Sequence, residues 1–289
     1  MSAIFDKITE FIKEFLISLI TGSLGNMFDD VNTKVGTIAA DVGQTPQAWN
    51  SSIFNLLHNL SDTVIVPIAG LIVTFILCYE LINMIMEKNN MHDIDTFMFF
   101  KYIFKAWVAV YIVTHTFDIT MAVFDLGQHI VTQSAGVIGA NTNIDISSAL
   151  TDIETTLSAM GLGELFLLVF ETSLICLCMK ILSICITVVI FGRMIEIYMY
   201  CSVGAIPFAT MTNREWGQIG NNYLRGLVAL ALQGFFIMVC VGIYAVLVNG
   251  FTATDNLHTT IFTIAAYTVV LCITLFKTGS ISKSILNAH

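Results

Sequence analysis

Charged side chains are scarce in this sequence. Asp, Glu, Lys and Arg make up only 11% of the 289 residues, whereas 56% are apolar and the mean hydropathy is +0.82. Ordinary soluble domains are about one quarter charged, and a soluble core of this size could not bury so many apolar side chains. The scarcity of charge therefore excludes a soluble protein and predicts a membrane protein.

Basic residues are the scarcer of the two charge classes. The chain has 12 Lys and Arg against 21 Asp and Glu, which gives a formal net charge of −9. A protein that wraps duplex nucleic acid needs a basic face. The acidic balance therefore excludes that class of DNA-binding protein.

Motifs for catalysis and metal binding are also missing. The sequence has no P-loop, no GxSxG and no HExxH, and it has seven cysteines without a CxxC pair. Its six histidines are scattered without ligand spacing. We therefore expect no enzyme activity, no cofactor and no metal site, and we interpret the cysteines as small apolar residues packed between helices.

Long apolar runs are what the sequence does contain. A spanning helix needs about 20 mostly apolar residues. The run 163–200 would be about 57 Å long as one helix, so we expect it to span at 164–190 and to extend to 206. Four other runs are long enough to span: 64–86, 102–124, 226–248 and 257–276. The prediction is an all-α, polytopic helical membrane protein with five transmembrane helices in the domain 64–289.

The basic residues indicate which connections face the cytoplasm. The connection 125–163, together with Glu164, contains five acids and no Lys or Arg, and 249–256 contains only Asp255. The connections 87–101 and 192–225 and the C-terminal tail all carry Lys or Arg. The positive-inside rule then predicts that the C-terminus is cytoplasmic, that 125–163 is an extracellular loop and that the N-terminus lies outside the plasma membrane.

Residues 1–63 are expected to form a separate extracellular, helical region. Within 2–24 the apolar residues follow a spacing of three and four, with charged residues opposite, which predicts an amphipathic helix ended by Gly22 and Gly25. Two further helices are predicted at 31–42 and 45–59.

Several charged residues fall inside the predicted spans. Glu80 and Lys180 each lie 16 residues from the outer end of their spans, or about 24 Å deep, and Lys105 lies near the same level. An unpaired charge at this depth costs at least about 2.5–3.5 kcal/mol. We therefore expect Glu80 to pair with Lys180 or Lys105. Lys180 is also the better candidate for a pore-lining residue.

Three more charged residues lie on the long third span. Glu171 has no evident partner in the sequence, and its separation of nine residues from Lys180 places the two on different faces of the helix. Arg193 and Glu196 are three residues apart, and we expect them to form a local pair at the cytoplasmic end.

The polar segment 204–225, GAIPFATMTNREWGQIGNNYLR, separates two long apolar runs and is called the elbow below. Pro207 should end the long helix, and Thr212 or Asn213 should cap the next one. A connector needs only a handful of residues, whereas this segment has about twenty, with aromatic and arginine residues suited to the headgroup level. We interpret it as a partner docking surface formed by Pro207, Arg214, Glu215, Trp216, Tyr223 and Arg225.

Three stretches carry a family resemblance. The run VIVPIAGLIVTFILCYELI (64–82), the elbow and the run LVALALQGFFIMVCVGIY (227–244) resemble TrbL-like conjugal transfer proteins of Gram-positive conjugative elements, which are polytopic inner-membrane subunits of type IV secretion systems. The resemblance implies a homo-oligomeric ring in membrane lipid. It also implies secretion ATPases and other secretion subunits as partners, with single-stranded DNA in transit.

Two classes of function follow. The first is a channel or scaffold subunit of a type IV secretion machine that moves a single-stranded DNA–protein complex. Its predicted cytoplasmic segments offer a weakly basic funnel, made by Lys88, Lys101, Arg193, Arg214, Arg225, Lys277 and Lys283. The alternative is a stand-alone small-solute transporter or ion channel. Many transporters are built from repeated halves, and this sequence shows no such repeat.

Overall fold

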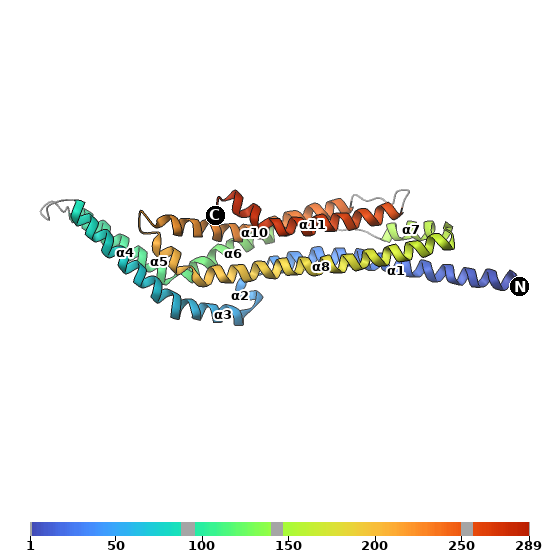
Figure 1. The fold of residues 1–289 in the computed structure, drawn as a ribbon, viewed down its shortest axis with the longest axis horizontal. Coiled ribbons are helices and arrows are strands. Elements are labelled where there is room, and N and C mark those ends of the chain that lie inside the picture. The colour runs from blue at the N-terminus through green and yellow to red at the C-terminus, as the bar shows by residue number, and fades with distance from the viewer. Residues whose placement is uncertain (1, 88–95, 140–146, 250–256, 289) are drawn as a thin grey trace. The chain divides into compact units, whose positions relative to one another are not determined.

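A computed structural model describes residues 2–87, 96–139, 147–249 and 257–288 (Figure 1). Within these ranges all regular elements are helices and there is no strand. The predicted all-α class is therefore confirmed. Lys88 and Asp255, which entered the charge argument, lie outside the described residues.

Five helical segments of the described chain are long and apolar enough to cross a membrane. This confirms a multi-pass helical membrane protein. The segments are Ser51–Met86, Phe97–Thr114, Leu162–Val203, Gly217–Val248 and His258–Ile285. Each overlaps one of the predicted spans, and the third is a single 42-residue helix, as its unbroken apolar run indicates.

The chain divides into two compact units. Unit 1 contains residues 1–42, 131–190 and 236–277, and unit 2 contains 43–130, 191–235 and 278–289. The predicted N-terminal region 1–63 is therefore not one unit, because the division falls after Val42. Below, each unit is described by itself.

Unit 1 contains the long helix α1, which runs from Ser2 to Val42 as one helix. Gly22 and Gly25 do not end this helix, contrary to the prediction. A glycine inside a helix costs only about 1 kcal/mol. Buried Ile20 before the two glycines, Leu24 between them and Ile38 after them join one apolar core with the first part of α8 (Leu162–Val203). Tertiary packing therefore outweighs the local breaking signal.

The predicted loop 125–163 is also largely helical. Helix α6 (Thr116–Gly139) continues well past residue 124, and α7 (Ser147–Ala159) follows it. Buried Ile153 and Leu157 place α7 in the core of unit 1, and the Lys13 ammonium donates to the Ser158 carbonyl at 2.7 Å. The acidic composition indicated exposure to water but did not exclude an amphipathic helix.

The predicted span 102–124 is divided at His115. Helix α5 (Thr96–Thr114) ends there and α6 begins at Thr116. The hydroxyls of Thr114 and Thr116 donate to backbone carbonyls three and four residues earlier. Such bonds compete with the helical ladder, which accounts for a break inside an apolar run.

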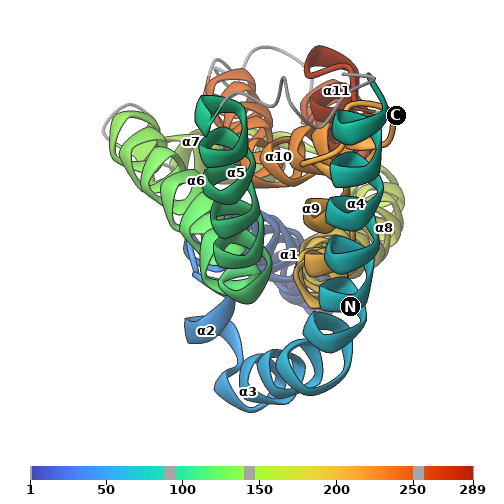
Figure 2. The ribbon, with the colours of Figure 1, turned by 90° about the vertical axis from the view of Figure 1, so that its left-hand side faces the viewer.

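Unit 2 begins with two short capped helices. Thr45 caps α2 (Pro46–Trp49) by accepting from the Ala48 amide, with the proline in the first turn as predicted. Asn50 then interrupts the predicted helix 45–59, because its extended backbone separates α2 from α3 (Ser51–Leu60) and its side chain caps α3. Figure 2 shows α3 continuing toward α4.

A small-residue core joins three helices of unit 2. A π-helical turn (Ser61–Ile65) leads from α3 into α4 (Val66–Glu87), which packs against α5 and the short helix α9 (Ala205–Thr210). Small side chains let helix backbones approach closely in membrane proteins. The buried residues of this core are Ala69, Val73, Ala109, Val113, Ala205 and Ala209.

Candidate functional site

The elbow is folded as a compact turn of unit 2. Helix α8 ends at Val203, α9 covers Ala205–Thr210, and α10 begins at Gly217 and runs to Asn249. The long helix therefore ends four residues before Pro207. That proline lies in the first turn of α9, where the missing N–H needs no partner. The predicted break in the long helix is present, and it lies one turn before Pro207.

Two glycines allow the elbow to close tightly. A Cβ atom at Gly204 would lie 2.7 Å from the Tyr223 hydroxyl oxygen, and one at Gly220 would lie 2.5 Å from the Pro207 carbonyl oxygen. Both distances are shorter than a real Cβ contact. Because the atom that opposes Gly220 belongs to the backbone, glycine is required there, where α9 meets α10, whereas at Gly204 a side chain would have to move.

Asn213 fixes the turn between α9 and α10. Its side-chain oxygen accepts from the backbone amides of Glu215 at 2.7 Å and Trp216 at 3.1 Å. Asn213 itself is buried, with 4% of its surface exposed. Asn213 was predicted to cap the next helix, but α10 begins only at Gly217, so this side chain caps the turn that precedes the helix.

Trp216 packs against α4. Its ring stacks on Phe75 at 5.9 Å between centroids and on Tyr79 at 6.4 Å, with interplanar angles of 9° and 10°. Trp216 was predicted to take part in partner docking. The structure gives this side chain a position inside unit 2, as a link between the elbow and the second half of α4.

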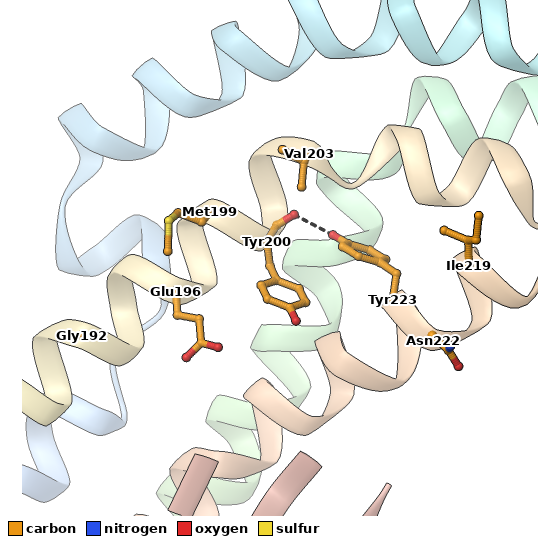
Figure 3. A pocket seen from close by; sticks show the side chains of 8 residues that line it. All are labelled: Gly192, Glu196, Met199, Tyr200, Val203, Ile219, Asn222 and Tyr223. Carbon is orange, nitrogen blue, oxygen red and sulfur yellow. Dashed lines mark hydrogen bonds between the residues drawn. The ribbon is translucent and has the colours of Figure 1, made fainter. Parts of the chain in front are cut away.

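Tyr223 joins α10 to the end of α8. Its hydroxyl donates to the Tyr200 carbonyl at 2.7 Å, and the two rings stack at 5.6 Å (Figure 3). Tyr223 is therefore also a structural contact. Of the predicted docking residues, Arg214, Glu215, Trp216 and Arg225 are exposed on the elbow.

A cavity of about 880 Å³ opens beside this tyrosine pair. Figure 3 shows side chains from the end of α8 and the start of α10 around it. Glu196 lines the cavity, and its carboxylate accepts from the Lys283 ammonium at 2.7 Å. The lining is otherwise mostly apolar and aromatic: Gly192, Met199, Tyr200, Val203, Ile219, Asn222 and Tyr223.

A second, more polar hollow of about 400 Å³ lies on the elbow itself. Its lining includes two arginines and several carboxamide side chains, in contrast to the first cavity. The lining residues are Met211, Asn213, Arg214, Gly217, Gln218, Asn221, Asn222 and Arg225.

Some of the charged residues inside the predicted spans pair with the partner that the sequence predicted, and others pair with a residue that it did not predict. Glu80 pairs with Lys105 at 2.5 Å, one of the two predicted alternatives. Glu171, which had no evident partner, contacts His258 at the start of α11 (Leu257–Ile285). The sequence did show a histidine at the start of another apolar helix, but its spacing from Glu171 did not indicate that the two residues pair.

The remaining charged residues of α8 differ in exposure. Lys180 is exposed, whereas Arg193 is buried, with 6% of its surface exposed. Glu196 pairs with Lys283, which lies 87 positions away in the sequence. The three-residue spacing of Arg193 and Glu196 did not suggest this partner. The predicted local pair of Arg193 and Glu196 stays a prediction.

Within the described residues no group of three or more His, Cys, Asp and Glu side chains could hold a metal ion. The elbow carries charged and polar side chains. It presents two guanidinium groups, one carboxylate and several carboxamides on a turn that is fixed by Asn213 and the stacked Trp216.

Comparison with known proteins gives one family. The family model described as TrbL/VirB6 plasmid conjugal transfer like protein matches residues 31–205, more than half of the chain. The match ends at the first residues of the elbow. No curated protein and no solved structure matches.

Proposed function

This chain belongs to the TrbL/VirB6 plasmid conjugal transfer-like family, and we propose that it is a membrane channel or scaffold subunit of a type IV secretion machine. In this role it helps to move single-stranded DNA with its attached protein across the plasma membrane. The family match over residues 31–205, combined with five membrane-crossing segments, carries the proposal.

Lys180 supports a channel that is made by several copies of the chain. It lies near the middle of the 42-residue helix α8 and is exposed, and it makes no ion pair within the described residues. A lysine facing hydrocarbon costs at least about 2.5–3.5 kcal/mol. In an assembled ring the same side chain can face water, where it would also attract a polyanion.

The elbow supports contact with a secretion ATPase on the cytoplasmic side, the side that the positive-inside rule assigns to it. Arg214 and Glu215 are exposed neighbours of opposite charge on a turn held by Asn213. Such rim charges select a partner and orient it. Trp216 and Tyr223 hold this face in place through their contacts with α4 and α8, and the exposed edge of Trp216 is open to the same partner.

The proposal is tested by deleting the chain in a donor strain and restoring it in trans. Mating frequency should fall below detection on deletion and return on complementation. Normal mating without the chain, together with an altered uptake of a small solute, would assign the chain to the transporter class.

A further inference from the structure

The hollow on the elbow has the composition of an anion-binding site. Two arginines and the carboxamides Gln218, Asn221 and Asn222 line it, and its lining residues include no carboxylate. Arginine binds phosphate oxygens in a bidentate manner, and carboxamide N–H groups can donate to the remaining oxygens. The hollow therefore suits a single phosphate-sized anion with polar substituents.

Both arginines are available to such an anion. Arg214 and Arg225 are exposed, and neither makes an ion pair within the described part of the chain. Glu215 is adjacent to Arg214 in the sequence, yet it is not among the residues that line the hollow. Both arginines thus line one hollow whose lining residues include no acid.

The position of the hollow along α10 indicates the source of the anion. Arg225 directly precedes the apolar run 226–248, and the other lining residues of α10 lie within its first two turns. This places the hollow where the helix enters the membrane, at the level of lipid headgroups. Basic pockets at this level bind anionic headgroups, and each Lys or Arg near the surface contributes about 1 kcal/mol.

The lining argues against single-stranded DNA as the occupant. Sites for single strands combine a basic groove with aromatic side chains on which bases stack. Among the lining residues there is no aromatic side chain, because Trp216 is stacked on Phe75 and Tyr79. A hollow of about 400 Å³ also accommodates one headgroup better than a continuous strand.

We propose that this hollow binds the phosphodiester of an anionic phospholipid headgroup, with Arg214 and Arg225 on the phosphate and the carboxamides on its polar substituents. A bound lipid would fix the elbow at the membrane surface. This inference goes beyond the proposed function and does not rest on it, because the lipid site needs neither the ATPase nor DNA.

The test uses the purified full chain in detergent, with bound lipid counted by native mass spectrometry. The probes are phosphatidylglycerol, phosphatidylcholine, inorganic phosphate and a 20-residue oligothymidylate. The variants are Arg214→Gln, Arg225→Gln and the control Lys7→Gln, which removes one exposed positive charge on α1. Melting temperatures without lipid show that each variant is folded.

The wild-type chain should bind phosphatidylglycerol in preference to phosphatidylcholine. Each arginine variant should bind phosphatidylglycerol about five-fold more weakly. Lys7→Gln should bind it with the wild-type affinity. Inorganic phosphate should compete only weakly. Equal binding of both lipids, equal loss in Lys7→Gln, or displacement of the lipid by oligothymidylate would overturn the proposal, and the last result would assign the hollow to DNA. Arg214→Gln lies at the exposed turn, so it remains informative if Arg225→Gln unfolds.

Discussion

The Lys105 ammonium lies 2.7 Å and 2.5 Å from the two carboxylate oxygens of Glu80, so that one ion pair joins the fifth helix to the fourth. Glu80 is mostly buried, with 19% of its side chain exposed, whereas 41% of the Lys105 side chain is exposed. The hydroxyl of Tyr102 adds a second link, because it donates to the Leu77 carbonyl at 2.9 Å. These contacts hold α4 and α5 together inside unit 2.

Breaking this pair on one side should cost more than removing both charges. Glu80→Gln and Lys105→Met each leave one ion in an apolar setting, at a cost of about 2–3 kcal/mol, whereas the double variant leaves none. Thermal unfolding in detergent should show coupling in the double-mutant cycle. Lys180→Met is the control: its effect on the free energy of unfolding should simply add to that of Glu80→Gln. If the Glu80 and Lys105 substitutions changed the free energy of unfolding additively, the pair would not form.

Asn213 should contribute to stability as a helix cap. Removing its side-chain oxygen with Asn213→Ala leaves two backbone amides of the turn without their acceptor, at a cost of about 1 kcal/mol. Asn213→Asp retains an acceptor oxygen and should unfold close to the wild-type temperature. Equal melting temperatures for Asn213→Ala and wild type would contradict the cap.

Trp216 should hold the elbow against α4 through its stacked rings. An aromatic pair contributes about 0.5–1.5 kcal/mol beyond buried area, so Trp216→Ala should raise hydrogen exchange in the turn 211–217, while Trp216→Phe should preserve most of the protection. If the tryptophan served only as a headgroup anchor, both variants would lower the membrane level of the protein and leave exchange in the turn unchanged.

The docking face should respond to reversal of either exposed charge. Arg214→Glu and Glu215→Arg should each reduce mating frequency while membrane level and oligomeric state stay normal, because a rim charge selects a partner without supporting the fold. Glu215→Arg is the more selective variant, since Glu215 does not line the polar hollow. Wild-type mating by both strains would leave the elbow as a connector.

The predicted sidedness can be measured by thiol labelling in a cysteine-free chain. Asn213 is an unsuitable cytoplasmic position because it is buried, so Glu215→Cys replaces it. Reagents that do not cross the membrane should label this position only after the cells are opened. Positions 141 and 255, predicted to be extracellular, lie outside the described residues and should be labelled in intact cells. Labelling of position 215 from outside would contradict the five-span orientation.

The sequence predicted the helical class and the five spans because their signal is local. An apolar run of sufficient length leaves the backbone no alternative to a helix in a membrane. The continuity of α1 across Gly22 and Gly25 could not be predicted, since it depends on Ile20, Leu24 and Ile38 packing in a core formed by distant segments.

The candidate site was predictable to a similar extent. The composition of the elbow indicated a capped turn, and Asn213 makes it. By contrast, the stacking of Trp216 on Phe75 and Tyr79 joins segments far apart in the sequence, so no local pattern could predict it. Glu171 with His258 and Glu196 with Lys283 are each separated by 87 positions, and their spacing carries no signal.

The claim that copies of this chain surround a path for DNA is tested most directly by cross-linking in mating cells. A photoreactive amino acid is placed at position 180 of α8 and, as a control, at position 107, where Trp107 is exposed on α5. After irradiation the chain is purified and the transferred strand is quantified. The account predicts that the strand is recovered with position 180 during mating and at background level with position 107. Background recovery at position 180, in a strain that still transfers DNA, would contradict it.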